Sequence, residues 1–170
     1  MAKTRKLALM ALFVAIALTI FMLEAQLPAP VPLPGVKLGL ANIVTVFTVF
    51  LLGPREGAAV LSVRIFLGAV FAGNFSTIFY SAAGGTLAIL TTIGLRRVLK
   101  ANQLWAAGCA GAVAHSIGQM AAAVMISGTP GLLVYLPVMI GISIITGLFT
   151  GLCAQFLLNR GGKFWKTIFR

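Results

Sequence analysis

The sequence predicts an all-α integral membrane protein, a single domain over residues 1–170 built as a bundle of six transmembrane helices. Two observations predict this fold class. Hydrophobic residues make up 60% of the chain and charged residues only 9%, and the apolar residues form long runs separated by short basic stretches. A bilayer core about 30 Å thick requires roughly 20 mostly apolar residues per helix. In a soluble domain the same composition would give an insoluble surface.

The apolar runs predict where the six helices lie. They cover residues 7–23, 38–52, 57–73, 76–95, 104–127 and 132–158. The second and third runs are short for a membrane span, whereas the others have the length that a span needs.

The basic residues predict the orientation of these helices. Of the thirteen Lys and Arg residues, all but two fall on one side of the predicted membrane; Lys37 lies on the other side and Arg64 inside the third helix. By the positive-inside rule both termini, including the basic tail 159–170, are expected in the cytoplasm. We therefore expect a multi-pass protein of the cell (cytoplasmic) membrane.

The N-terminus permits a second interpretation. Lys3–Lys6 followed by an apolar run is also typical of a secretory signal peptide, with a weak cleavage site at Leu23–Ala25. The run is long for a signal peptide, and its loss would leave five helices and an outward N-terminus. We therefore expect the first helix to be retained.

Residues 24–37 form a predicted Pro-rich outer loop. Its prolines, at positions 28, 30, 32 and 34, exclude a helix and favour an extended path. The loop is apolar as well, so we expect it to lie against the bundle or to dip into the outer membrane face. It is either a stiff connector or a lid over an outward-facing cavity.

Small residues indicate close helix packing. Ala8, Ala11 and Ala15 place methyl groups on one face of the first helix, which permits close contact with another helix. For the corresponding glycines of the later helices we expect internal packing. They are Gly84, Gly85, Gly108, Gly111, Gly147 and Gly151.

Arg64 is the most unusual polar residue at membrane depth, where an unpaired charge is costly. It cannot realistically deprotonate, and the two carboxylates of the chain, Glu24 and Glu56, are not obvious neighbours. A bound anion or a wet cavity would satisfy Arg64. Alternatively, Arg64 caps backbone carbonyls or pairs with Glu24. Glu56 is expected to form a local ion pair with Arg55 in a tight inner turn.

A polar strip in the fifth helix is the second candidate feature. His115 and Gln119 are four residues apart and share one face, and Ser116 extends the strip. The strip either contacts a ligand or makes structural hydrogen bonds. Together with residues expected near the outer face, the candidate substrate-binding set is Arg64, His115, Gln119, Asn42, Asn74, Tyr80, Lys37 and Tyr135.

The chain lacks the residues that several kinds of chemistry require. The chain has no aspartate, so paired-carboxylate catalysis, an Asp-rich magnesium diphosphate site and a Walker-type ATPase are unsupported. Cys109 and Cys153 are single, without metal-site or disulfide spacing. No basic stripe alternates with aromatics as nucleic-acid binding requires. We expect neither an enzyme nor a bound cofactor or metal; uphill transport would need a partner or a coupled ion.

The order of these features resembles a known class of proteins. A basic N-terminus, an alanine-stepped first helix and a Pro-rich loop precede Pro34-Gly-Val-Lys-Leu-Gly-Leu-Ala-Asn42 and Leu51-Leu-Gly-Pro-Arg-Glu-Gly57. Over essentially its whole length the chain resembles the substrate-binding S components of energy-coupling factor (ECF) transporters. More closely, it resembles the group known as Gx transporter or heptaprenyl diphosphate synthase component I.

The resemblance implies a six-helix bundle that binds a small molecule from outside, between the first loop and the outer ends of helices four to six. It also implies that the alanine face, with Ala11 and Ala15, docks on a membrane coupling subunit attached to two ATPases. Vitamin-like ligands such as flavins are common in the broader class. Arg64, Lys37 and His115 would suit an anionic or phosphate-bearing compound.

Two other functions are compatible with the sequence. The synthase name suggests a membrane accessory of prenyl diphosphate or quinone precursor synthesis, which would be non-catalytic because the chain lacks Asp-rich motifs. An autonomous ion-coupled carrier is the third possibility, although the shortage of membrane carboxylates argues against proton coupling.

Overall fold

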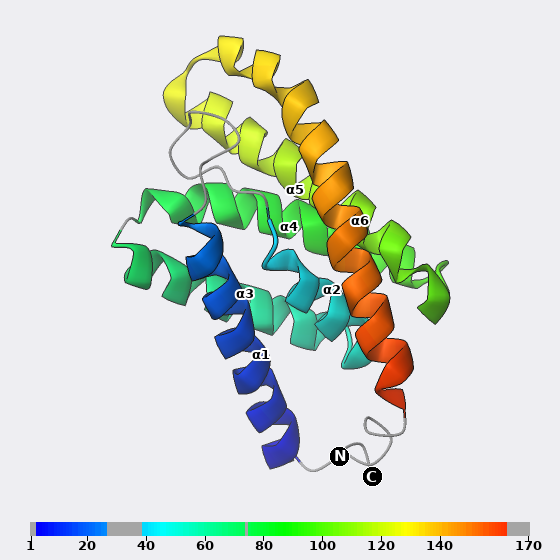
Figure 1. Ribbon diagram of the computed structural model, residues 1–170. Helices are drawn as coiled ribbons and strands as arrows, with labels where there is room; N and C mark the ends of the chain where they lie inside the picture. Colours follow the sequence, from blue (N-terminus) through cyan, green and yellow to red (C-terminus); the bar gives the residue numbers. More distant parts are fainter. Residues whose placement is uncertain (1–2, 27–38, 74, 163–170) are drawn as a thin grey trace.

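The computed structural model describes residues 3–26, 39–73 and 75–162, and within these ranges every regular element is helical (Figure 1). The six α-helices are α1 (Lys3–Glu24), α2 (Asn42–Leu51), α3 (Pro54–Ala72), α4 (Ser76–Arg96), α5 (Leu104–Ser127) and α6 (Leu136–Arg160). Two short 3₁₀ turns, η1 (Ala101–Gln103) and η2 (Pro130–Tyr135), precede α5 and α6. The all-α, six-helix prediction is therefore confirmed.

The second helix is shorter than its apolar run predicts. Gly39 has a left-handed backbone, with φ of +79°, which a right-handed helix cannot contain. Its carbonyl instead accepts a hydrogen bond from the Asn42 N–H in a turn, at 2.9 Å. The helix therefore starts at Asn42, four residues after the approximate start that the sequence predicts, and α2 has ten residues. Residue 38 lies outside the described residues.

Four helical segments are long and apolar enough to cross a membrane: Lys3–Glu24, Ser76–Arg96, Leu104–Ser127 and Pro130–Arg160. The chain is therefore a membrane protein with transmembrane helices. At a rise of about 1.5 Å per residue, the ten residues of α2 span about 15 Å, half of a bilayer core. Six complete crossings stay a prediction.

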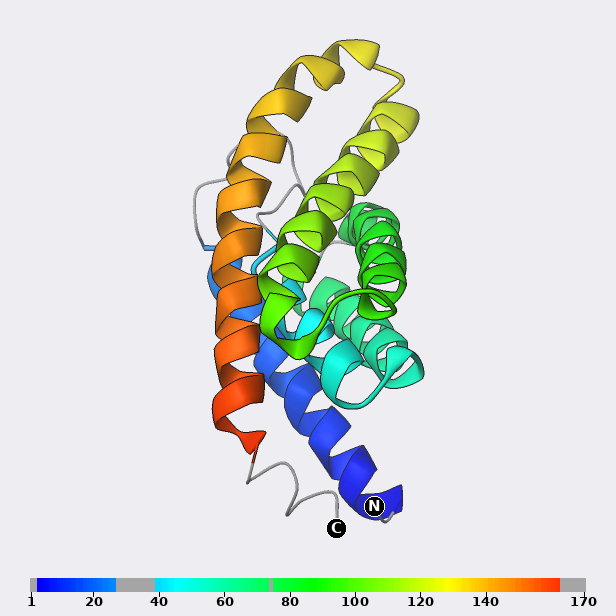
Figure 2. The same cartoon turned by 90° about the vertical axis from the view of Figure 1, so that its right-hand side faces the viewer.

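The first turn of α1 and the last turn of α6 lie at one end of the molecule, and the α5–α6 connection lies at the other (Figures 1 and 2). An ion pair between Lys6 and Glu56 brings the start of α3 to the first of these ends, and Arg96 at the end of α4 lies beside Gly53. We call this the basic end; it agrees with the predicted charge pattern.

Glycines allow the helix backbones to touch. A Cβ atom on Gly108 of α5 would lie 2.5 Å from the Gly151 Cα atom of α6, and one on Gly118 would lie 2.6 Å from the Ala83 carbonyl oxygen of α4. Only glycine fits at such approaches. The internal packing expected for the glycines of α5 and α6 is confirmed, and Figure 2 shows these two helices side by side.

Candidate functional site

Polar side chains from four helices are buried together in the apolar bundle. Each is at most 5% exposed: Glu24 of α1, Asn42 of α2, Arg64 of α3, and His115 and Gln119 of α5. We call these five residues the polar cluster. Four of them belong to the set that the sequence predicts, and Glu24 joins them from the last turn of α1.

Arg64 faces the last turn of α1. Its guanidinium carbon lies 5.5 Å from the centroid of the Phe21 ring, a cation–π distance. The same ring fills the space beside Gly68, one turn after Arg64, where a Cβ atom would lie 2.9 Å from the Phe21 Cε1 atom. Glu24, one turn after Phe21, lies within electrostatic range of Arg64. The interpretation that Glu24 is not an obvious neighbour was therefore wrong.

Glu24 also binds the chain just before the second helix. Its carboxylate accepts a hydrogen bond from the Gly39 N–H, with a donor–acceptor distance of 2.5 Å. Gly39 in turn packs on the imidazole of His115, since a Cβ atom there would lie 3.3 Å from the His115 Cδ2 atom. The Glu24 carboxylate of α1 and the His115 ring of α5 therefore both contact Gly39. Its need for a positive φ and for a small side chain was not apparent from the sequence.

His115 and Gln119 point together toward α4. A Cβ atom on Gly84 would lie 2.8 Å from Gln119 Cγ and 2.9 Å from His115 Nδ1, so the absence of a side chain at position 84 makes room for both. His115 also lies within electrostatic range of Arg64. The predicted shared face of His115 and Gln119 is confirmed.

Three polar atoms of the polar cluster have no hydrogen-bond partner in the part of the chain that the structure describes. They are Arg64 Nε, His115 Nδ1 and Gln119 Oε1, all fully buried. His115 Nδ1 faces the backbone of Gly84, but without the geometry of a hydrogen bond. Buried polar atoms are nearly always hydrogen-bonded, and an unmade bond is costly. These atoms are therefore suited to binding a polar ligand.

Ser116 does not extend this strip. Its hydroxyl hydrogen-bonds the Ser143 hydroxyl of α6 at 2.5 Å, and Ser143 donates to the Met139 carbonyl at 2.7 Å. One residue corresponds to about 100° around a helix, so Ser116 faces α6 whereas His115 faces α4. Ser116 is a structural contact between α5 and α6.

The remaining predicted residues differ in their distance from the polar cluster. Asn42 lies at the edge of the cluster to which it belongs, since its Nδ2 atom lies beside Gly111, one turn before His115. Tyr80 is half-buried one turn before Gly84. Tyr135 is 39% exposed in η2, near the α5–α6 connection, and is not part of the cluster. Lys37, Asn74 and the Pro-rich loop from residue 27 to 37 lie outside the described residues.

The alanine face of α1 is exposed and borders α3. Ala8, Ala11 and Ala15 are exposed, whereas α1 buries Phe13, Ala17, Phe21 and Glu24. A groove of about 490 Å³ lies between α1 and α3 and is lined only by apolar residues. Its lining includes Ala11, Ala15, Ala59, Val60 and Val63. All three alanines are thus accessible, and Ala11 and Ala15 lie where α1 borders the groove.

Glu56 is held at the basic end by a different helix from the one expected. Its carboxylate accepts a hydrogen bond from Lys6 Nζ of α1, so the predicted local pair with Arg55 is not the main contact. The hydrogen bond from Lys6, assisted by the Lys6 and Arg55 charges, keeps the pKa of Glu56 below its ordinary value. Glu56 therefore links α1 to α3 and has a structural role.

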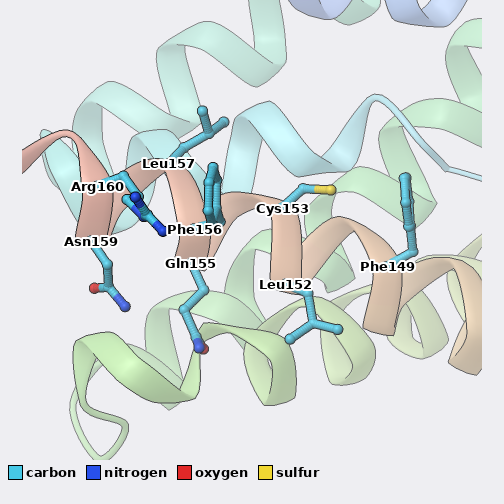
Figure 3. A pocket seen from close by; sticks show the side chains of 8 residues that line it. All are labelled: Phe149, Leu152, Cys153, Gln155, Phe156, Leu157, Asn159 and Arg160. Atoms are coloured by element: carbon cyan, nitrogen blue, oxygen red, sulfur yellow. The ribbon is translucent and has the colours of Figure 1, made fainter.

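A larger hollow, of about 930 Å³, runs along the end of α6 (Figure 3). All its lining residues belong to α6, from Phe149 to Arg160, and the Arg160 guanidinium carbon lies 5.3 Å from the Phe156 ring centroid. Because one helix lines it, the hollow is an open surface. Neither this hollow nor the α1–α3 groove is lined by Arg64, His115 or Gln119.

Comparison with known proteins gives one match. The family model described as heptaprenyl diphosphate synthase component I matches residues 13–157, which include all or most of every helix. No curated protein and no solved structure matches the chain.

Proposed function

The chain belongs to the heptaprenyl diphosphate synthase component I family, and from this premise we propose that it is the membrane-embedded substrate-binding component of an ECF-type uptake transporter. It binds a small vitamin-like or anionic metabolite, such as a flavin, from outside the cell. The observation that carries the proposal is the polar cluster with its three unpartnered buried atoms.

A ligand explains these unpartnered atoms better than a structural role does. Where α5 and α6 meet, the buried hydroxyls of Ser116 and Ser143 satisfy each other. Arg64, His115 and Gln119 lie at a comparable depth but keep one polar atom each without a partner in the described residues. A bound molecule would supply the missing hydrogen bonds, each worth about 0.5–1.5 kcal/mol.

The position of the polar cluster favours entry from outside. Glu24 is the last residue of α1, about 30 Å of helix away from the Lys6 region at the basic end. Asn42 is the first residue of α2. If the basic end faces the cytoplasm, as the positive-inside rule predicts, Glu24 and Asn42 place their side of the cluster toward the outer half of the membrane.

The free alanine face supports the proposed partner. Ala8, Ala11 and Ala15 present small side chains along the exposed side of α1, and small residues let helix backbones approach closely in a membrane. We propose that the coupling subunit, which carries two ATPases, docks a helix on this face in the cytoplasmic membrane.

Native mass spectrometry of the gently solubilised protein tests the proposed ligand. We expect the wild type to carry a small water-soluble metabolite and Gln119→Leu to lose it. Ser116→Ala serves as the matched control, because it removes a buried polar group of the same helix that faces α6, and it should keep the ligand. A wild type without any bound metabolite, or equal retention in both variants, would refute the proposal.

A second function has one observation in its favour. The apolar α1–α3 groove of about 490 Å³ could hold an isoprenoid chain, as a non-catalytic membrane accessory of prenyl diphosphate or quinone precursor synthesis would require. The same measurement separates the two functions. A co-purifying isoprenoid diphosphate or quinone precursor would favour the accessory role, and a soluble metabolite would favour transport.

A further inference from the structure

We propose that Glu24 is the fixed counter-ion of Arg64, so that the part of the substrate that enters the polar cluster carries no net charge and binds through an amide-like edge. This inference rests on the proposed function and narrows its substrate class. It concerns the group that contacts the cluster, and it leaves open the charge of the rest of the molecule.

The packing of α1 on α3 places Glu24 one helical turn from the ring that Arg64 contacts. Phe21 and Glu24 are one turn apart on α1 and are both buried. The Phe21 ring lies beneath the Arg64 guanidinium, 5.5 Å from its carbon atom, and beside Gly68 one turn further along α3. Glu24 therefore extends from the same α1–α3 contact that holds Arg64. Both side chains are only 5% exposed, so water screens their attraction weakly.

The charges of the polar cluster then cancel. Among the described residues that form it, Arg64 and Glu24 are the two with formal charge. Glu24 is kept in place by the Gly39 N–H, and the other carboxylate of the chain, Glu56, is engaged by Lys6 at the basic end. A carboxylate or phosphate entering the cluster would meet Glu24 as well as Arg64, and like charges at short range in a poorly solvated site repel strongly.

The three unpartnered atoms determine which hydrogen-bonding groups a ligand must present to the polar cluster. Arg64 Nε–H is a donor, Gln119 Oε1 is an acceptor, and His115 Nδ1 serves as either. A cyclic amide, imide or ureido group offers an acceptor and an N–H donor next to each other and can satisfy both kinds of atom. An ionised carboxylate or a fully ionised phosphate presents only acceptors and would leave Gln119 Oε1 without a partner.

Phosphate-dependent stability tests the counter-ion role. Glu24→Gln removes the negative charge with little change in shape, so the variant should gain an anion site at Arg64. We expect inorganic phosphate to leave the unfolding temperature of the wild type unchanged. In Glu24→Gln we expect a saturable rise of about 5 °C or more at phosphate 100-fold above its Kd. The rise should disappear in Glu24→Gln/Arg64→Gln.

Two outcomes would overturn the inference: phosphate stabilisation of the wild type that Arg64→Gln abolishes, or a Glu24→Gln variant that folds but gains no phosphate effect. If Glu24→Gln does not fold, the double variant decides. Two cancelling charges predict that Glu24→Gln/Arg64→Gln folds better than either single variant, whereas a double variant as unstable as the sum of both changes contradicts the pairing.

The native mass spectrum separates this inference from the proposed function. If the wild type carries a soluble metabolite and is also stabilised by phosphate through Arg64, the transporter proposal stands. The inference that an uncharged, amide-like group enters the polar cluster then fails. No bound metabolite together with a phosphate gain in Glu24→Gln would do the reverse: the counter-ion role would stand and the substrate-binding proposal would fall.

Discussion

Gly84→Ala should damage the polar cluster by inserting one methyl group between α4 and α5. The new Cβ atom would lie 2.8 Å from Gln119 Cγ, 2.8 Å from the His115 carbonyl oxygen and 2.9 Å from His115 Nδ1. The backbone oxygen cannot move without shifting α5. The two helices must therefore separate where His115 and Gln119 point toward α4.

The same helix provides a control for this substitution. Gly94 of α4 has no atom within 4 Å of the position that its Cβ would take. Gly94→Ala should therefore show only the helix-propensity gain, about 0.5–1 kcal/mol of added stability. Overpacking at Gly84 should cost about 1–3 kcal/mol. For a chain of this size the two variants should then differ by at least about 3 °C in unfolding temperature.

Thermal unfolding of the purified protein and its ligand content by native mass spectrometry measure both consequences. We expect Gly84→Ala to be less stable than the wild type and to lose its ligand, and Gly94→Ala to keep the ligand with equal or greater stability. If Gly84→Ala is as stable as Gly94→Ala and retains the ligand, the close contact of α4 with His115 and Gln119 is refuted.

Two further predictions concern α1. Ala11→Trp/Ala15→Trp should abolish co-purification with the coupling subunit but keep ligand binding, because these side chains are exposed. The control Leu12→Trp changes another exposed residue of α1 and should keep both co-purification and ligand binding. Loss of folding in the double variant would instead assign the alanines to internal packing. The lowered pKa of Glu56 means that its ion pair with Lys6 stabilises the fold above the ordinary carboxyl pKa and ceases to do so as the pH falls through the lower folded-state value. Since the Lys6 side chain is 41% exposed, Glu56→Gln should lower the free energy of unfolding by no more than about 1 kcal/mol. Chemical unfolding at neutral and acidic pH should show that this loss shrinks as the pH falls. A loss that is independent of pH would contradict the ion pair.

The pairing of charges shows what the sequence could indicate and what it could not. The positive-inside pattern placed Lys6 and Glu56 at the same predicted membrane face, so their contact was within reach of sequence reasoning, although the neighbouring Arg55 was the expected partner. Glu24 and Arg64 are forty positions apart, in helices whose crossing point no local pattern specifies. They lie on the same side of the α1–α3 contact because Phe21 packs beside both Gly68 and Arg64.

The polar strip of α5 was predicted correctly only in part. The spacing of His115 and Gln119 fixed their shared face, because residues four apart lie one above the other on a helix. The spacing could not tell that this face meets α4 through Gly84, nor that Ser116 meets Ser143 of α6. Both facts depend on where neighbouring helices pack.

The sequence by itself determined the membrane class, the six helices and the end of the molecule at which the basic residues gather, because helix length, hydropathy and charge are local properties of the chain. Only the tertiary structure decided which helix faces meet, and with them the polar cluster and the free alanine face. In a membrane, lipid is as apolar as the interior of the bundle. An apolar side chain therefore does not reveal whether it faces lipid or another helix, and the partners of the few polar ones appear only when the helices pack.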